Sequence, residues 1–255
     1  CANQAGEDNR NIARMALLLA GLPFSVPGET VNRLCASGMS SVIHAHRAVS
    51  AGDGDVFIAG GVENMTRGPW VISKASKPFG RDSQMYDSSF GWRFINPKMK
   101  KIYGVDGMGE TAENLAVKYN ISREDQDKFA YHSQMKAAKS QSEGRLEKEI
   151  IPVEIPQRKK ESILFSQDEF IKRNTSLEVL GKLRTAFKKE GGTVTAGNSS
   201  GLNDGAAAML IASEKGLKKN GLTPIAEIVS SAVVGVEPRI MGIGPVKASE
   251  RALKK

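Results

Sequence analysis

The sequence predicts an α/β protein that is interrupted by a long charged insertion. Three observations lead to this prediction. A short β-leaning segment is followed by a tight turn of small residues, a helix and a short apolar strand, an order typical of βαβ units. Residues 66–190 are more charged and less periodic than the segments on either side. Regular apolar segments then return after residue 190.

The first part of the chain alternates helix and strand signals. Apolar residues with helical spacing fill residues 11–22 and stop at a Gly-Leu-Pro sequence, which predicts a helix with a defined end. Residues 30–34 favour a short β segment, and a small-residue turn from Cys35 to Gly38 leads into a helix that we expect to reach about residue 50. Residues 55–62 are short, apolar and closed by glycines, as in a buried parallel strand.

The insertion contains two predicted helices, over residues 110–119 and 122–143. Ser122 with Asp125 predicts an N-cap followed by an acidic first turn. Beyond the insertion we expect a loop at 198–205, a strand at 206–212, a basic helix at 213–220, a strand at 225–236 and the start of a helix at 248–255.

Composition excludes several classes of protein. No apolar run approaches the roughly 18 residues that cross a bilayer, and residues 1–11 lack the pattern of a secretory signal. We expect a cytoplasmic protein without membrane contact, and organelle targeting stays open because the sequence begins at Cys1 rather than Met.

The net charge of +8 is concentrated in one segment. Residues 67–190 hold 24 Lys and Arg against 17 Asp and Glu, a net +7. Such a segment is either a solvated surface or a surface that meets the phosphates of a nucleotide cofactor. We expect no nucleic-acid partner, because no nucleic-acid-binding motif accompanies the charge.

Two cysteines, Cys1 and Cys35, exclude a disulfide framework, and no Cys/His group has metal-ligand spacing. Cys35 lies where a β segment turns into a helix, and the N–H groups and dipole at a helix N-terminus stabilise a thiolate. The small residues after it would let a substrate approach the Cys35 backbone N–H, an oxyanion donor for acyl transfer through a thioester. The competing interpretation is a buried structural cysteine at a tight turn.

Residues 31–69, VNRLCASGMSSVIHAHRAVSAGDGDVFIAGGVENMTRGP, resemble the active-site segment of thiolases. These are acyltransferases that exchange an acyl group between coenzyme A and an enzyme cysteine. The resemblance continues, in family order, through GMGETAENLA, ISREDQDKFA, EIIPVEIP, KLRTAFKKEGGTVTAGNSSGLNDGAAAMLIAS and VGVEPRIMGIGPVKAS.

The resemblance implies an incomplete thiolase fold, in which the amino-terminal βαβαβαββ half carries a loop-domain insertion. It assigns residues 1–65 and 191–222 to the amino-terminal domain, 66–190 to the loop insertion that covers coenzyme A, and 223–255 to the start of the carboxy-terminal domain. We expect the sequence to be truncated at both ends relative to the family. A homodimer or homotetramer is the usual thiolase assembly.

The resemblance also implies roles for seven residues. Cys35 aligns with the nucleophile that becomes acylated. Ser200 aligns with a serine that contacts the pantetheine arm of coenzyme A, and Lys172 falls where many thiolases place an arginine against the nucleotide. The other four line the same site: Ala196 and Leu202 in the pantetheine tunnel, Met108 and Met241 in the acyl pocket. The family uses no tightly bound cofactor, and coenzyme A and acyl-CoA are its substrates.

Thiolases need further acid–base groups, which the family carries in GHPxGxxG and CxGGG motifs. Neither motif occurs in this sequence. His44, His46 and His132 fall on predicted helices outside any such motif, and we interpret them as ordinary helix positions. We therefore expect the 255 residues alone not to complete a thiolase cycle.

The favoured function is cleavage of a 3-oxoacyl-CoA with coenzyme A to acetyl-CoA and a shortened acyl-CoA, or the reverse condensation. Segments such as YDSSFGWRFINPKMKKIYGVDGM are most similar to thiolases for 3-oxoadipyl-CoA in aromatic degradation, with an acetoacetyl-CoA thiolase as the near alternative. A β-ketoacyl synthase-like condensing enzyme and a noncatalytic acyl-CoA-binding protein remain as other interpretations.

Overall fold

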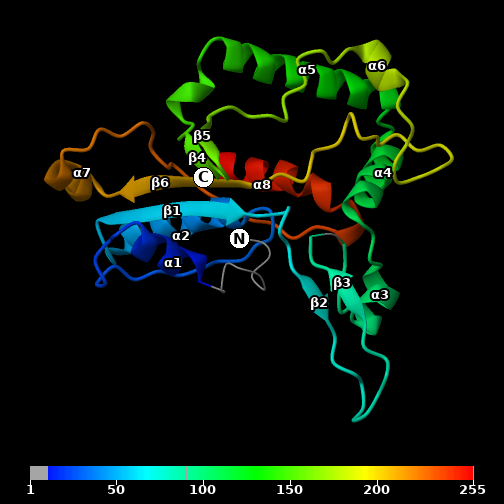
Figure 1. Cartoon of the computed structure of the whole chain (residues 1–255), viewed down its shortest axis with the longest axis horizontal. Coiled ribbons are helices and arrows are strands. Elements are labelled where there is room, and N and C mark those ends of the chain that lie inside the picture. Colours follow the sequence, from blue (N-terminus) through cyan, green and yellow to red (C-terminus); the bar gives the residue numbers. More distant parts are fainter. Residues whose placement is uncertain (1–10, 90, 255) are drawn as a thin grey trace. The chain divides into compact units, whose positions relative to one another are not determined.

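The computed structural model describes residues 11–89 and 91–254 (Figure 1). They form two compact units, each built from segments that are distant in sequence. The first unit combines the chain up to residue 102 with residues 202–235 and 244–255, and the second combines residues 103–201 with 236–243. Residues 1–10, and with them Cys1, lie outside the described part.

An antiparallel pair of strands, β1 (Val56–Glu63) and β6 (Gly205–Ala212), forms the centre of the first unit. Helix α2 (Ser37–Ala51) packs against both strands, and Ile43, Ala45 and Ala59 are buried there (Figure 1). The unit also holds α1 (Ile12–Leu19), the short hairpin of β2 (Trp70–Ile72) and β3 (Met85–Asp87), α3 (Pro97–Tyr103), α7 (Glu214–Asn220) and α8 (Gly244–Leu253).

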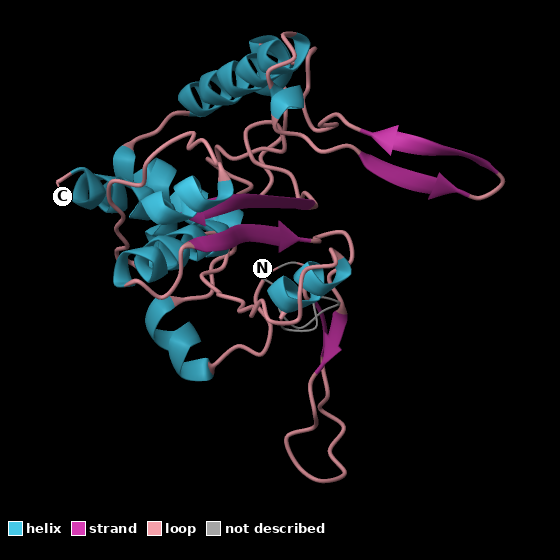
Figure 2. Cartoon of the chain, turned by 90° about the vertical axis from the view of Figure 1, so that its left-hand side faces the viewer, coloured by secondary structure: helices cyan, strands magenta, loops and turns pink. Residues whose placement is uncertain are grey.

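Helices dominate the second unit. They are α4 (Met108–Tyr119), α5 (Arg123–Ser142), η1 (Leu146–Lys148), α6 (Leu177–Gly181) and η2 (Pro238–Ile243). Helix α4 packs against η2, and α5 packs against α6. Strands β4 (Val153–Gln157) and β5 (Lys160–Phe165) form a separate two-stranded ribbon (Figure 2).

Several predicted elements are confirmed with small changes of boundary. The helices expected at 11–22, 110–119, 122–143 and 213–220 are α1, α4, α5 and α7. Ser122 is the N-cap of α5, because its hydroxyl accepts a hydrogen bond from the Asp125 backbone N–H, and Ser213 caps α7 in the same way. Helix α8 begins at Gly244, four residues before the expected start at Ala248.

Three predictions about strands were wrong. The strand expected to be parallel, β1, pairs with β6 in antiparallel register, so residues 35–62 do not close a βαβ unit within the described chain. Residues 30–34 form no strand: Arg33 makes only an isolated bridge with Cys35, and the Leu34 backbone N–H bonds the Asn32 side chain rather than a neighbouring strand. Residues 225–236 form no strand in the described chain, where each named strand is paired with one other and none of them lies in this segment.

Candidate functional site

Cys35 is a free, exposed thiol at the turn that leads into α2. The residue before it, Leu34, has a φ of 48°, which is the left-handed region that a leucine rarely adopts. Ser37 holds this turn, because its Oγ donates to the Leu34 carbonyl at 2.6 Å and accepts from the Arg33 N–H at 2.9 Å. A fixed, exposed thiol next to strained backbone is an arrangement that functional sites often adopt.

Small residues let the first turn of α2 lie close to β1. A Cβ atom on Gly61 would come within 3.2 Å of the Gly38 Cα. Ser41 donates from its hydroxyl to the Gly60 carbonyl at 2.8 Å, and Ser37 and Ser40 are buried against the sheet. The small residues noted after Cys35 therefore pack the helix against the sheet as well as leaving the thiol accessible.

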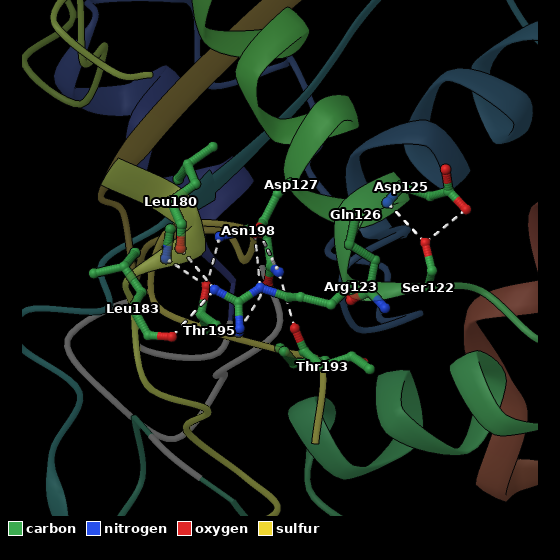
Figure 3. A network of polar contacts seen from close by, with 12 residues as sticks. Ser122, Arg123, Asp125, Gln126, Asp127, Leu180, Leu183, Thr193, Thr195 and Asn198 are labelled. Atoms are coloured by element: carbon green, nitrogen blue, oxygen red, sulfur yellow. Dashed lines mark hydrogen bonds and ion pairs between the residues drawn. The ribbon is translucent and has the colours of Figure 1, made fainter. Parts of the chain in front are cut away.

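The segment that leads to Ser200 is held in the second unit by two buried carboxylates, of which Figure 3 labels Asp127. Glu113 on α4 is 4% exposed and accepts hydrogen bonds from the backbone N–H groups of Thr193 and Val194. Asp127 on α5 is 5% exposed and accepts one from the Asn198 side-chain amide at 2.9 Å. These bonds join two helices of the insertion to the segment 193–198.

The same loop continues into β6 through Asp204. Its carboxylate accepts a hydrogen bond from the Thr66 backbone N–H at 2.9 Å, and this bond lowers the pKa of Asp204 below its usual value. The bond ties the start of β6 to the end of β1, since the two residues flank the paired strands. Leu202, two residues before Asp204, is 55% exposed.

Met108 and Met241 lie on elements of the second unit that pack together, α4 and η2. Both side chains are exposed, Met108 to 65% and Met241 to 40%. Asp106 joins the two elements by accepting from Arg239 Nε at 2.9 Å and from Asn114 Nδ2 at 2.7 Å. The Arg239 hydrogen bond lowers the pKa of Asp106 and raises that of Arg239.

Lys172 lies on a segment that is fastened along α5. Its backbone N–H donates to Gln134 Oε1 at 2.7 Å, and its ammonium lies 5.7 Å from the centre of the Phe170 ring. A hollow of about 620 Å³ adjoins this segment and is lined by residues that include Phe129, His132 and Ile171. Lys172 itself is exposed and follows Ile171, which lines this partly apolar hollow.

The predicted site residues fall into two groups. Cys35 and Leu202 belong to the first unit, and Met108, Lys172, Ala196, Ser200 and Met241 belong to the second. All seven are exposed.

The three histidines lie on helices, His44 and His46 on α2 and His132 on α5. In the described part of the chain, no group of three or more His, Cys, Asp or Glu side chains could hold a metal ion, and no helix is long and apolar enough to cross a membrane.

The fold and the site thus describe an α/β chain with a free, exposed cysteine at the turn before a helix. The family model for the thiolase N-terminal domain matches residues 1–215, and the chain therefore belongs to the thiolase family.

Relatives and solved structures agree with this assignment. The chain is 54% identical to the Escherichia coli 3-oxoadipyl-CoA/3-oxo-5,6-dehydrosuberyl-CoA thiolase and 53% identical to a beta-ketoadipyl-CoA thiolase of Acinetobacter baylyi. Both matches cover all of this chain and 63% of the relative, so the chain spans about 63% of their length. The structure of human mitochondrial 3-ketoacyl-CoA thiolase, 38% identical, superposes with a TM-score of 0.89 over 99% of this chain and 62% of that one. The thiolase-like α/β fold is thus confirmed for the part that this chain spans.

Most of the residues that hold the segment 193–198 and the turn before α2 give no signal in the sequence. Glu113, Asp127 and Asn198 form the buried contacts of the second unit, yet on the sequence the two acids resemble solvent-facing helix residues. Leu34 could not be recognised either, because leucine gives no signal for a positive φ. Asp204, in an Asn-Asp-Gly sequence, did carry a turn signal.

Proposed function

We propose that this chain supplies the acyl-carrying half of a thiolase, with Cys35 as the nucleophile. The exposed Cys35 thiol at the rigid turn before α2 is the observation that carries the proposal. The thiolate attacks the C3 carbonyl of a 3-oxoacyl-CoA, the C2–C3 bond breaks, and the departing carbon takes a proton to give acetyl-CoA. Coenzyme A then displaces the shortened acyl group from Cys35, and the condensation runs through the same steps in reverse.

The chain's own groups account for the thioester but not for the proton transfers at carbon. The backbone N–H groups near the start of α2 are oriented along the helix axis, toward the end where Cys35 lies, and can stabilise negative charge there. The proposed contacts of the acyl-CoA are six exposed residues: Ser200, Leu202, Ala196, Met108, Met241 and Lys172. The proposed substrate is a 3-oxoadipyl-CoA or a similar 3-oxoacyl-CoA, because the relatives at 53–54% identity bear the names of such thiolases.

Thioester exchange with acetyl-CoA tests the role of Cys35. At a pH of about 8.5, solvent can ionise thiols without help from a protein base, so the chain alone should become acetylated. Digestion and mass spectrometry should place the acetyl group on Cys35, and Cys35→Ala should abolish it. Cys1 serves as the internal control thiol, and Cys1→Ala should leave the labelling unchanged.

Two results would contradict the proposal. Equal labelling of Cys1 and Cys35 would show ordinary thiol reactivity rather than a site. Binding of coenzyme A without any acetylation of Cys35 would favour the noncatalytic acyl-CoA-binding interpretation instead.

A further inference from the structure

Residues 193–200 belong to none of the named strands: one antiparallel bridge, in which the Ala186 N–H donates to the Val194 carbonyl at 2.9 Å, holds them by backbone, and side chains supply the contacts described next. Both oxygens of the Glu113 carboxylate take part: Oε1 accepts from the N–H groups of Thr193 and Val194, each at 2.8 Å, and Oε2 accepts from the Thr193 hydroxyl at 3.0 Å. Val194 is 4% exposed, so its N–H has little access to water as an alternative partner. Glu113 thus fixes the beginning of the segment.

Asn198 fixes the end of the segment, two residues before Ser200. Its Nδ2 donates to Asp127 Oδ1 at 2.9 Å and to the Thr193 carbonyl at 3.0 Å, and its Oδ1 accepts from the Thr195 N–H at 2.8 Å (Figure 3). Two of these bonds fold the segment into a tight loop, and the third attaches it to α5. Thr195, at its centre, is fully buried.

Asp127 is itself held in place. Its Oδ2 accepts from Arg123 Nε at 2.8 Å, and the same guanidinium donates to the carbonyls of Leu180 and Leu183 (Figure 3). A buried carboxylate is costly unless charge-assisted hydrogen bonds satisfy it, as they do here. The loop therefore rests on a support whose own geometry is fixed by α5 and α6.

We propose that Glu113 and Asp127 are positioning residues that hold residues 193–200, and with them Ser200, in the conformation that receives the pantetheine arm of coenzyme A. This role rests on the coenzyme A binding proposed above. A loop that is already ordered loses less conformational entropy when a flexible ligand binds, so the support should appear as affinity for the pantetheine part. Neither carboxylate is assigned a contact with the ligand itself.

Two ligands separate positioning from general stability. Isothermal titration calorimetry with coenzyme A measures the whole site, and titration with 3′,5′-ADP measures the nucleotide part alone. Glu113→Ala removes every hydrogen bond that the carboxylate accepts from Thr193 and Val194. It should weaken coenzyme A binding by about tenfold or more, the loss of about 1.4 kcal/mol, while 3′,5′-ADP binding stays unchanged. Glu113→Gln keeps an oxygen for both N–H groups and should restore most of the affinity.

Ser213→Ala is the matched control, because it removes the N-cap of α7 in the first unit and touches neither residues 193–200 nor the helices that support them. It should lower the melting temperature while leaving both affinities unchanged. Should Glu113→Ala fail to fold by circular dichroism, Asn198→Ala is tested by the same pair of ligands, with the same expected split.

An equal loss for the two ligands, or no loss for either, would overturn the positioning role. A loss with Glu113→Gln as large as that with Glu113→Ala would overturn it too. If the unaltered chain binds neither ligand, the proposed coenzyme A site itself is wrong, which is a separate result from a failure of the variants.

Discussion

Leu34 offers a direct measure of the strain stored beside Cys35. An L-residue in the left-handed region pays about 1–2 kcal/mol. Glycine avoids this cost, although it loses about 0.5–1 kcal/mol more backbone entropy than alanine on folding. The Leu34 side chain is 65% exposed, so its removal sacrifices little packing. Leu34→Gly should therefore be more stable than Leu34→Ala by about 0.5–1 kcal/mol, because glycine has no Cβ and adopts the φ of 48° without strain, whereas alanine does not.

Urea unfolding followed by tryptophan fluorescence suits this comparison. Trp70 and Trp92 are the two tryptophans of the sequence, and both lie in the same unit as Leu34. With a slope of about 1–3 kcal/mol per molar urea, the glycine variant should unfold at a midpoint a few tenths of a molar higher. It should also acetylate more slowly at Cys35, since the turn can then sample other conformations. A glycine variant less stable than the alanine variant would refute the assignment of strain.

The second prediction concerns Gly60, where an added Cβ would lie 2.4 Å from the Ala207 carbonyl oxygen; Gly60→Ala should cost about 1–3 kcal/mol. Gly205→Ala, with nothing within 4 Å, should change tryptophan-monitored stability by less than about 0.5 kcal/mol, and equal losses would contradict the packing described. The third concerns Asp204, whose pKa is lowered by the Thr66 N–H. Its stabilising effect is present above the ordinary aspartate pKa of about 4 and lost as pH falls, so the midpoints of wild type and Asp204→Asn should converge on acidification; a constant gap would argue against the bond. The fourth is that Lys172→Arg binds 3′,5′-ADP more tightly than wild type and Lys172→Ala more weakly, because a planar guanidinium can stack on adenine; identical affinities would remove Lys172 from the site.

Local signals allowed the helices to be predicted well. Helix α5 was recognised from the Ser122 cap and the acids of its first turn, both of which act within four residues. Whether β1 pairs in parallel or antiparallel direction could not be predicted, because a short apolar run occurs in strands of both kinds of sheet. Its partner, β6, is also far away in the sequence.

In the candidate site too, the features that depend on neighbouring residues were predictable, and those that depend on distant residues were not. The resemblance of residues 31–69 to thiolases made Cys35 the candidate nucleophile, since the motif is continuous in sequence. The hydrogen bonds that hold residues 193–200 could not be predicted from the sequence. Glu113 and Thr193 are 80 residues apart, and the residues around one give no indication of the other. Burial of an acid depends on what covers it, and that information is tertiary.

The pairing of β1 with β6 also constrains when the first unit can form. Asp55, just before β1, bonds Ser213, just after β6, across 158 residues of sequence. At the usual rate of about 5–20 residues per second, a ribosome needs roughly 8–30 s to synthesise that stretch. During this interval β1 has no β6 to pair with, whereas α5 already has the residues that cap it. Pulse-labelled ribosome-bound chains should accordingly show protected amides in α5 before β1, because the apolar β1 stays without its partner strand until β6 has been made.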